Sequence, residues 1–195
     1  MVRIFLAAVD VIPAAVVLVP LFGVLFVTKY RYDLCRTVFS CLFCMYLSAV
    51  YALVGIPNIL YIRPELSLNL IPLVGMVSDF KNSILNIALF MPLGILLPLL
   101  WEQFRKVRYC AAFGLCFSVG IELLQMLTFR ATDINDLVTN VCGTLLGFYL
   151  WNLTGQKQIP DQTKGYESML WCIVCFGLMF FVHPFLSPFI WDGLL

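Results

Sequence analysis

Long apolar stretches separated by short polar connections dominate the pattern of this chain. Each stretch is close to the roughly 17–25 residues that a helix needs to cross a bilayer. We therefore predict an all-α fold, a polytopic membrane helix bundle of about six transmembrane helices that forms a single integral membrane domain over residues 1–195. The predicted spans cover residues 5–27, 37–56, 83–101, 109–128, 136–153 and 168–190.

Two of the connections between these spans differ in character. Residues 57–82 contain Pro57, Pro64 and Pro72 but are only moderately polar. This pattern predicts an ordered loop that dips into the membrane and contacts either other protein segments or water there. Residues 154–167 are polar, and this connection is predicted to be solvated.

The composition is typical of a membrane protein, and the net charge limits which classes of partner are expected. Hydrophobic residues make up 62% of the 195 residues and charged residues 12%, and the mean hydropathy is +0.97. Soluble domains carry about 25% charged residues. The net charge of +1 provides no basic excess for binding nucleic acid, so membrane lipids are the expected partners. The sequence indicates no cofactor.

Basic residues predict how the spans are oriented, because cytoplasmic loops are enriched in Lys and Arg. The connections after the first, third and fifth predicted spans hold eight basic residues, against four on the other side. We therefore predict a multi-pass protein of the cell membrane with both termini extracellular. The eight are Lys29, Arg31, Arg36, Arg105, Lys106, Arg108, Lys157 and Lys164, and the four are Arg3, Arg63, Lys81 and Arg130.

Polar side chains recur at helical spacing where the third, fourth and fifth predicted spans reach the outer side. Gln125 follows Glu122 at i+3, so both lie on one face of the fourth span. Asp136 is predicted to cap the fifth helix, where the helix dipole favours a carboxylate. We therefore expect a polar intramembrane site that faces outward. Its candidate residues are Asn82, Asn86, Glu122, Gln125, Arg130, Asp133, Asp136 and Asn140.

Small residues and a proline indicate how the third and fifth spans pack. Gly143 and Gly147 form a GxxxG pair, which allows close approach of another helix. Pro92 removes a backbone amide from the third span and is predicted to kink it close to Gly94. We assign Pro92, Gly94, Gly143 and Gly147 to helix packing.

Cysteines and the single histidine are the remaining candidates for metal or redox chemistry. Cys41/Cys44 and Cys172/Cys175 have CxxC spacing, which occurs in metal and redox sites. Inside apolar spans, however, cysteines are typical packing residues. A lone histidine binds metal poorly, so His183 is interpreted as an interfacial packing residue, and no metal site is predicted.

Taken in order, these motifs resemble the VanZ-like family. The likeness covers residues 65–150, the expected VanZ-like core, and it includes the Asn69-Leu-Ile-Pro72 element. The resemblance implies a bacterial envelope protein, and some members of the family are associated with reduced susceptibility to the glycopeptide teicoplanin. The residues that carry it are Asn82, Asn86, Phe90, Pro92, Gly94, Pro98, Glu122, Gln125, Arg130, Asp133, Asp136, Asn140, Gly143 and Gly147.

Several functions agree with such a site, and the sequence leaves them open. The resemblance favours lowered susceptibility to lipophilic glycopeptides such as teicoplanin, with the antibiotic or a lipid-linked head group as ligand. Arg130 has the fork geometry to bind phosphate or carboxylate. One alternative is an intramembrane enzyme that acts on a lipid-linked head group with carboxylate acid/base groups, although Ser118 lacks an activating neighbour and the catalytic residues are unknown. Others are a small lipid or solute transporter and a purely structural polar network.

Overall fold

A computed structural model describes residues 2–31, 33–62, 68–69, 80–128, 132–155, 158–159 and 165–194 of the chain. The described chain is almost entirely helical, which confirms the predicted all-α class. Two strands of two residues each are the exception. In order, the elements are α1 (Val2–Thr28), α2 (Leu34–Val54), β1 (Leu68–Asn69), α3 (Phe80–Leu100), the 3-10 helix η1 (Glu102–Arg105), α4 (Val107–Gln125), β2 (Thr132–Asp133), α5 (Ile134–Leu153), α6 (Tyr166–Gly177), the π-helix η2 (Leu178–Val182) and α7 (His183–Leu194).

Five helical stretches of the described chain are long and apolar enough to cross a membrane. The fifth predicted span, now α5, has sufficient length with 20 residues but is not among them. Its first two turns contain Asn135, Asp136 and Asn140, which lower its hydropathy and need polar neighbours inside a membrane. The five stretches are Val9–Thr28, Leu34–Val54, Phe80–Leu100, Val107–Gln125 and Tyr166–Trp191.

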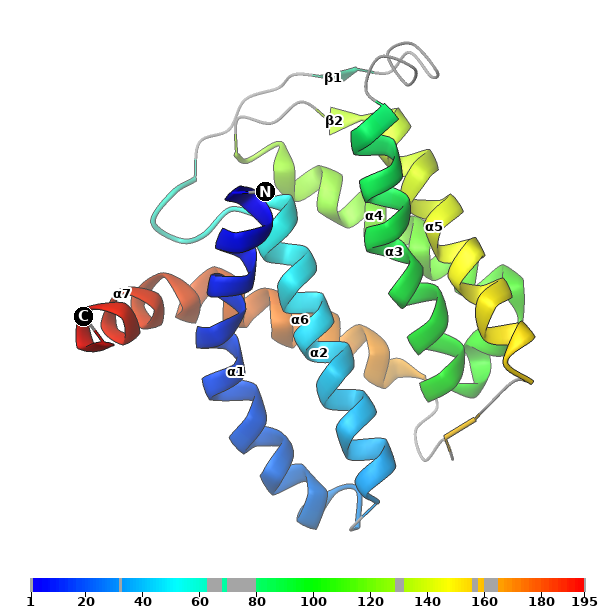
Figure 1. Cartoon of the computed structure of the whole chain (residues 1–195), viewed down its shortest axis with the longest axis horizontal. Helices are drawn as coiled ribbons and strands as arrows, with labels where there is room; N and C mark the ends of the chain where they lie inside the picture. Colours follow the sequence, from blue (N-terminus) through cyan, green and yellow to red (C-terminus); the bar gives the residue numbers. More distant parts are fainter. Residues whose placement is uncertain are drawn as a thin grey trace. The chain divides into compact units, whose positions relative to one another are not determined.

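The helices group into two compact units. Unit 1 comprises Met1–Ile62 and Glu167–Leu195, and unit 2 comprises Arg63–Tyr166. Figure 1 shows α1 and α2 packed side by side in unit 1, and α3 beside α5 in unit 2. The predicted core at residues 65–150 falls within unit 2. Most of the predicted membrane-dipping loop lies outside the described residues.

In unit 1, local sequence signals define both ends of α2. Asp33 is the N-cap, and its side chain accepts a hydrogen bond from the backbone N–H of Arg36 at 2.9 Å. Gly55 ends the helix with φ 67°, a left-handed conformation that favours glycine. Aromatic residues connect this hairpin to α6, where the rings of Phe22 and Trp171 have centroids 5.0 Å apart.

The CxxC pairs lie where α2 and α6 meet. Cys44 and Cys175 are buried, and the Cys175 thiol donates a hydrogen bond to the Cys44 carbonyl at 3.6 Å. The Tyr51 hydroxyl donates to the Cys172 carbonyl at 3.1 Å. The described cysteines are free thiols, and these two contacts join the helices directly.

A π-helical turn, η2, joins α6 to α7. In η2 the His183 N–H donates to the carbonyl five residues earlier, where an α-helix would use the carbonyl four residues earlier. The Phe180 carbonyl accepts a hydrogen bond from the Ile59 N–H at 3.1 Å. His183 Nε2 lies 3.5 Å from Asp10 Oδ1 on α1, within ion-pair distance but without hydrogen-bond geometry. His183 thus faces a carboxylate, a contact that was not predicted from the sequence.

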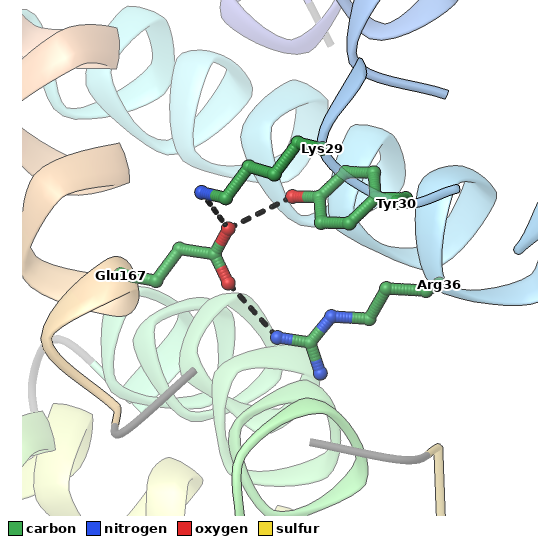
Figure 2. A network of polar contacts seen from close by, with 4 residues as sticks. All are labelled: Lys29, Tyr30, Arg36 and Glu167. Atoms are coloured by element: carbon green, nitrogen blue, oxygen red, sulfur yellow. Dashed lines mark hydrogen bonds and ion pairs between the residues drawn. The ribbon is translucent and has the colours of Figure 1, made fainter. Parts of the chain in front are cut away.

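A buried carboxylate connects α6 to the loop between α1 and α2. Glu167 Oε1 accepts hydrogen bonds from Lys29 Nζ at 2.5 Å and from the Tyr30 hydroxyl at 2.9 Å, and Oε2 accepts one from Arg36 Nη2 at 2.9 Å (Figure 2). The Glu167 and Arg36 side chains are 0% exposed. We call these four residues the Glu167 cluster. The prediction that residues 154–167 are a solvated loop is therefore wrong at its C-terminal end.

In unit 2, α3 and α5 run parallel with their backbones in contact. A Cβ added to Gly143 would lie closer than 3.0 Å to the Ile87 carbonyl oxygen, and one added to Gly147 equally close to that of Met91. Both pairs advance by four residues, one helical turn, so the contact follows a single face of each helix. Any side chain at either glycine would separate the helices.

Thr144 lies where α3, α4 and α5 meet. Its backbone carbonyl faces Gly94 of α3 and its side chain faces Gly114 of α4, so closely that a Cβ at either glycine would come within 3.0 Å. The Thr144 hydroxyl is satisfied inside its own helix, because it donates to the Asn140 carbonyl at 3.0 Å. α3 continues from Phe80 to Leu100 with Pro92 inside it. The three helices therefore form a tightly packed base for the polar residues at their ends.

Candidate functional site

The polar side chains that the sequence singled out, as far as the structure describes them, lie at one end of unit 2. α3 and α5 begin at this end, and α4 runs antiparallel to them and ends there (Figure 1). The short strands β1 and β2 lie at the same end and pair in parallel, with Asn69 opposite Asp133. Three helix ends and a strand pair therefore surround the candidate site.

The first polar contact joins α3 to α5. Asn86 Nδ2 donates a hydrogen bond to Asp136 Oδ1 at 2.7 Å. α5 begins at Ile134, so Asp136 lies inside the first turn and is not the N-cap, contrary to the prediction. A carboxylate in the first turn still interacts favourably with the positive end of the helix dipole. The contact thus places an anionic group where both helices begin.

The second polar contact joins α5 to α4. Asn140 Nδ2 donates a hydrogen bond to Ser118 Oγ at 2.8 Å, and both side chains are buried. Asn140 is only 4% exposed, yet its Oδ1 has no hydrogen-bond partner among the described residues. Turning the amide over would exchange its oxygen and nitrogen and leave the other atom unpaired. One buried polar atom therefore remains available to a ligand or an ordered water.

Glu122 and Gln125 continue the same face of α4 toward its end. Both are buried, at 6% and 4% exposure, and Glu122 lies one turn beyond Ser118. Burying an ionisable side chain in an apolar helix costs free energy, which is why such residues often mark function in membrane proteins. The face therefore presents a hydroxyl, a carboxyl group and an amide in succession.

Three predicted residues are not in this buried or half-buried set. Asn82 is exposed, one turn before Asn86. Arg130 and the side chain of Asp133 lie outside the described residues, although the Asp133 backbone is placed by β2. The predicted residues that are buried or half-buried at the three helix ends are Asn86, Glu122, Gln125, Asp136 and Asn140.

Two buried polar residues in the first two turns of α5 were missing from the prediction. Asn135 is 6% exposed and Thr139 is 1% exposed. The Thr139 hydroxyl donates to the backbone carbonyls of Asn135 and Asp136, each at 3.0 Å. Their polarity inside a predicted span was the available signal, and i+4 spacing from Asn135 to Thr139 already placed both on one face.

The described part of the site consists of amides, hydroxyls and carboxyl groups. Within this part of the chain, no group of three or more His, Cys, Asp or Glu side chains is arranged to hold a metal ion. The Ser118 hydroxyl faces an amide, which is not a base that takes up its proton. This chemistry suits recognition of a polar group by hydrogen bonds.

Comparison with protein families gives a match that covers these residues and the helices around them. The family model described as VanZ/LLP1 matches residues 38–155, more than half of the chain. The chain belongs to the VanZ/LLP1 family. The matched region begins in α2 and contains α3, α4 and α5, so it starts earlier than the core predicted at residues 65–150. The Glu167 cluster lies outside it.

An individual member of the VanZ/LLP1 family supports this assignment. Protein VanZ from Enterococcus faecium is 34% identical to the chain over 93 residues, which are 46% of this chain and 55% of that protein. The chain therefore covers about half the length of this curated relative. No solved structure matches the chain.

Proposed function

We propose that this membrane protein lowers susceptibility to lipophilic glycopeptides such as teicoplanin through the polar site at the ends of α3, α4 and α5. The observation that carries the proposal is a pair of contacts, the half-buried one from Asn86 to Asp136 and the buried one from Asn140 to Ser118, inside the region that matches the VanZ/LLP1 family. Apolar helices bury such groups at a cost, and a ligand-binding role provides a reason to retain them.

The expected selectivity follows from the anchoring of the drug. Teicoplanin carries an acyl chain, and each methylene buried in the outer leaflet contributes about 0.8 kcal/mol. The drug is therefore concentrated at the membrane surface, where the predicted orientation opens this site. A protein that binds head groups or changes their accessibility there acts mainly on the anchored drug and less on soluble vancomycin.

The chemistry of the site supports binding or surface modification more than an enzyme with a serine nucleophile. Ser118 is the buried serine among the described residues of the site, and its partner is the Asn140 amide. Serine nucleophiles depend on an adjacent general base. The remaining described groups are suited to hold a hydroxyl-bearing or charged head group.

Expression in a susceptible Gram-positive host tests this function. We expect the inhibitory concentration of teicoplanin to rise more than that of vancomycin. Asp136→Asn should abolish the rise, because the amide oxygen can still accept the hydrogen bond of Asn86 while the charge is lost. Glu122→Gln and Arg130→Ala should have the same effect. Membrane levels of each variant are measured by immunoblotting.

Glu102→Gln is the matched control, since it makes the same chemical change at an exposed carboxylate after the far end of α3. This variant should keep the full rise. Equal shifts for both drugs would refute the leaflet mechanism and point to altered peptidoglycan termini. If every site variant is degraded, the polar contacts are structural.

The orientation has its own test. In a cysteine-free background, cysteines placed at Thr132 and Gln158 should label from opposite faces of the membrane. We expect Thr132→Cys to react with an impermeant maleimide in intact cells, and Gln158→Cys only after permeabilisation, because cytoplasmic loops are basic. Labelling in the reverse order would turn the site toward the cytoplasm and rule out direct contact with an extracellular antibiotic.

A further inference from the structure

The Glu167 cluster carries more positive charge than its carboxylate neutralises. Lys29 and Arg36 both donate to Glu167, which leaves a net charge of +1 among the cluster's side chains. Burial raises the pKa of Tyr30, so its hydroxyl stays protonated and donates to Glu167 without adding a negative charge. Farther along the loop, Arg31 adds a positive charge and Asp33, the cap of α2, adds a negative one. The excess positive charge therefore persists over the whole loop.

The excess positive charge is accessible to a ligand at Lys29. The Lys29 side chain is 36% exposed, whereas those of Arg36 and Glu167 are 0% exposed. Lys29 has three N–H groups and uses one for Glu167. Arg31 is exposed as well, and its left-handed backbone, with φ 48°, is unusual for a non-glycine residue. Two cations thus reach solvent or lipid at one turn.

One of the rings beside Lys29 carries an unsatisfied donor. The ammonium nitrogen is 5.8 Å from the centroid of the Trp171 ring and 5.7 Å from that of Tyr30. Trp171 is 5% exposed, and its Nε1 has no hydrogen-bond partner among the described residues. An indole N–H can only donate. Lys29, Arg31 and the indole of Trp171 are all donors, so a group that binds here must supply an acceptor, and the two cations favour one with negative charge.

The cluster lies at head-group level in the membrane. The span of α1 ends at Thr28, that of α2 begins at Leu34 and that of α6 begins at Tyr166. Lys29 is the first residue beyond the α1 span, and Glu167 is the second residue of the α6 span. Tyr and Trp residues commonly occupy this level, and basic pockets between helices on the cytoplasmic side bind anionic head groups.

We propose that Lys29, Arg31 and the Trp171 N–H bind the phosphate of an anionic membrane lipid, and that Glu167 positions Lys29 for this contact. Large apolar side chains are exposed next to the cluster and provide a surface for the acyl chains, which distinguishes a lipid from free phosphate. They are Val24, Val27, Leu34, Met169 and Leu170. The site is formed by residues of unit 1 and lies outside the family match.

The test uses the purified full-length chain in nanodiscs of phosphatidylcholine, with or without phosphatidylglycerol. We expect phosphatidylglycerol to raise the unfolding temperature and to remain bound in native mass spectrometry. Lys29→Gln should lose both effects, while Lys29→Arg should keep them because it preserves the charge. Lys106→Gln, at an exposed lysine of another basic loop, is the matched control and should behave as wild type.

Arg31→Gln keeps the test valid if Lys29→Gln fails to fold, because Arg31 makes none of the hydrogen bonds to Glu167. It should also retain less phosphatidylglycerol than wild type. Equal behaviour of wild type in both nanodiscs, or full retention by Lys29→Gln or Arg31→Gln, would overturn the proposal. An equal rise of the unfolding temperature with glycerol phosphate in phosphatidylcholine nanodiscs would overturn the assignment to a lipid.

Discussion

Replacing Glu167 with alanine is expected to unfold unit 1. The change removes the acceptor of three hydrogen bonds and leaves the guanidinium of Arg36, which is 0% exposed, without this carboxylate. Breaking a buried ion pair from one side costs about 3–5 kcal/mol. This is a large fraction of the roughly 5–15 kcal/mol that stabilises a typical protein. Membrane levels and thermal unfolding in detergent measure the loss.

Two further variants test whether Glu167→Ala destabilises the protein because it leaves a buried charge unpaired or because it removes packing contacts. Glu102→Ala removes an exposed carboxylate and should leave the unfolding temperature nearly unchanged. The double variant Arg36→Met with Glu167→Met replaces both buried charges by apolar side chains and should recover much of the stability. A Glu167→Ala protein that unfolds at the wild-type temperature would show that the cluster does not hold unit 1 together.

Gly147→Ala is expected to separate α3 from α5. The added methyl group would come closer than 3.0 Å to the Met91 carbonyl oxygen, which belongs to the backbone and moves only with the whole helix. Overpacking of this kind costs about 1–3 kcal/mol and sometimes more. It should also pull Asn86 away from Asp136 and remove the teicoplanin phenotype. The unfolding temperature and the inhibitory concentration test both effects.

Gly120→Ala is the control, since a Cβ at Gly120 of α4 meets nothing within 4 Å. Alanine is favoured over glycine inside a helix by about 1 kcal/mol, so this variant should be as stable as wild type or more so. If Gly147→Ala behaves like Gly120→Ala, the close contact between α3 and α5 is not what holds the site together.

The helices and the polar end of unit 2 were predictable because their signals are local. Apolar length located the spans, and i, i+3 and i, i+4 spacing placed Glu122, Gln125 and Asn140 on helix faces. The relation between α3 and α5 could be anticipated only in part. GxxxG indicates that some helix approaches Gly143 and Gly147, but not that Ile87 and Met91 of α3 provide the contact.

The Glu167 cluster could not be predicted from local pattern. Glu167 is separated from Lys29 by 138 residues, and its neighbours in sequence are polar. In the sequence, Lys29 and Arg36 look like ordinary basic residues of a cytoplasmic loop, so they were used only to predict the orientation of the spans. Only the packing of α6 against the hairpin of α1 and α2 turns these charges into a buried ion pair.

The π-helical turn makes the direction of α7 sensitive to the number of residues before it. An α-helix rotates by about 100° per residue. The π-helical turn at Leu178–Val182 contains one more residue than an α-helical turn. In a regular α-helix, an extra residue at this point would instead rotate all the residues that follow. The resulting orientation of the helix places His183 next to Asp10 and lets the Phe180 carbonyl accept the hydrogen bond of Ile59. Insertions or deletions within η2 should therefore be tolerated far less than substitutions of the same residues, because they would turn α7 to a different neighbour.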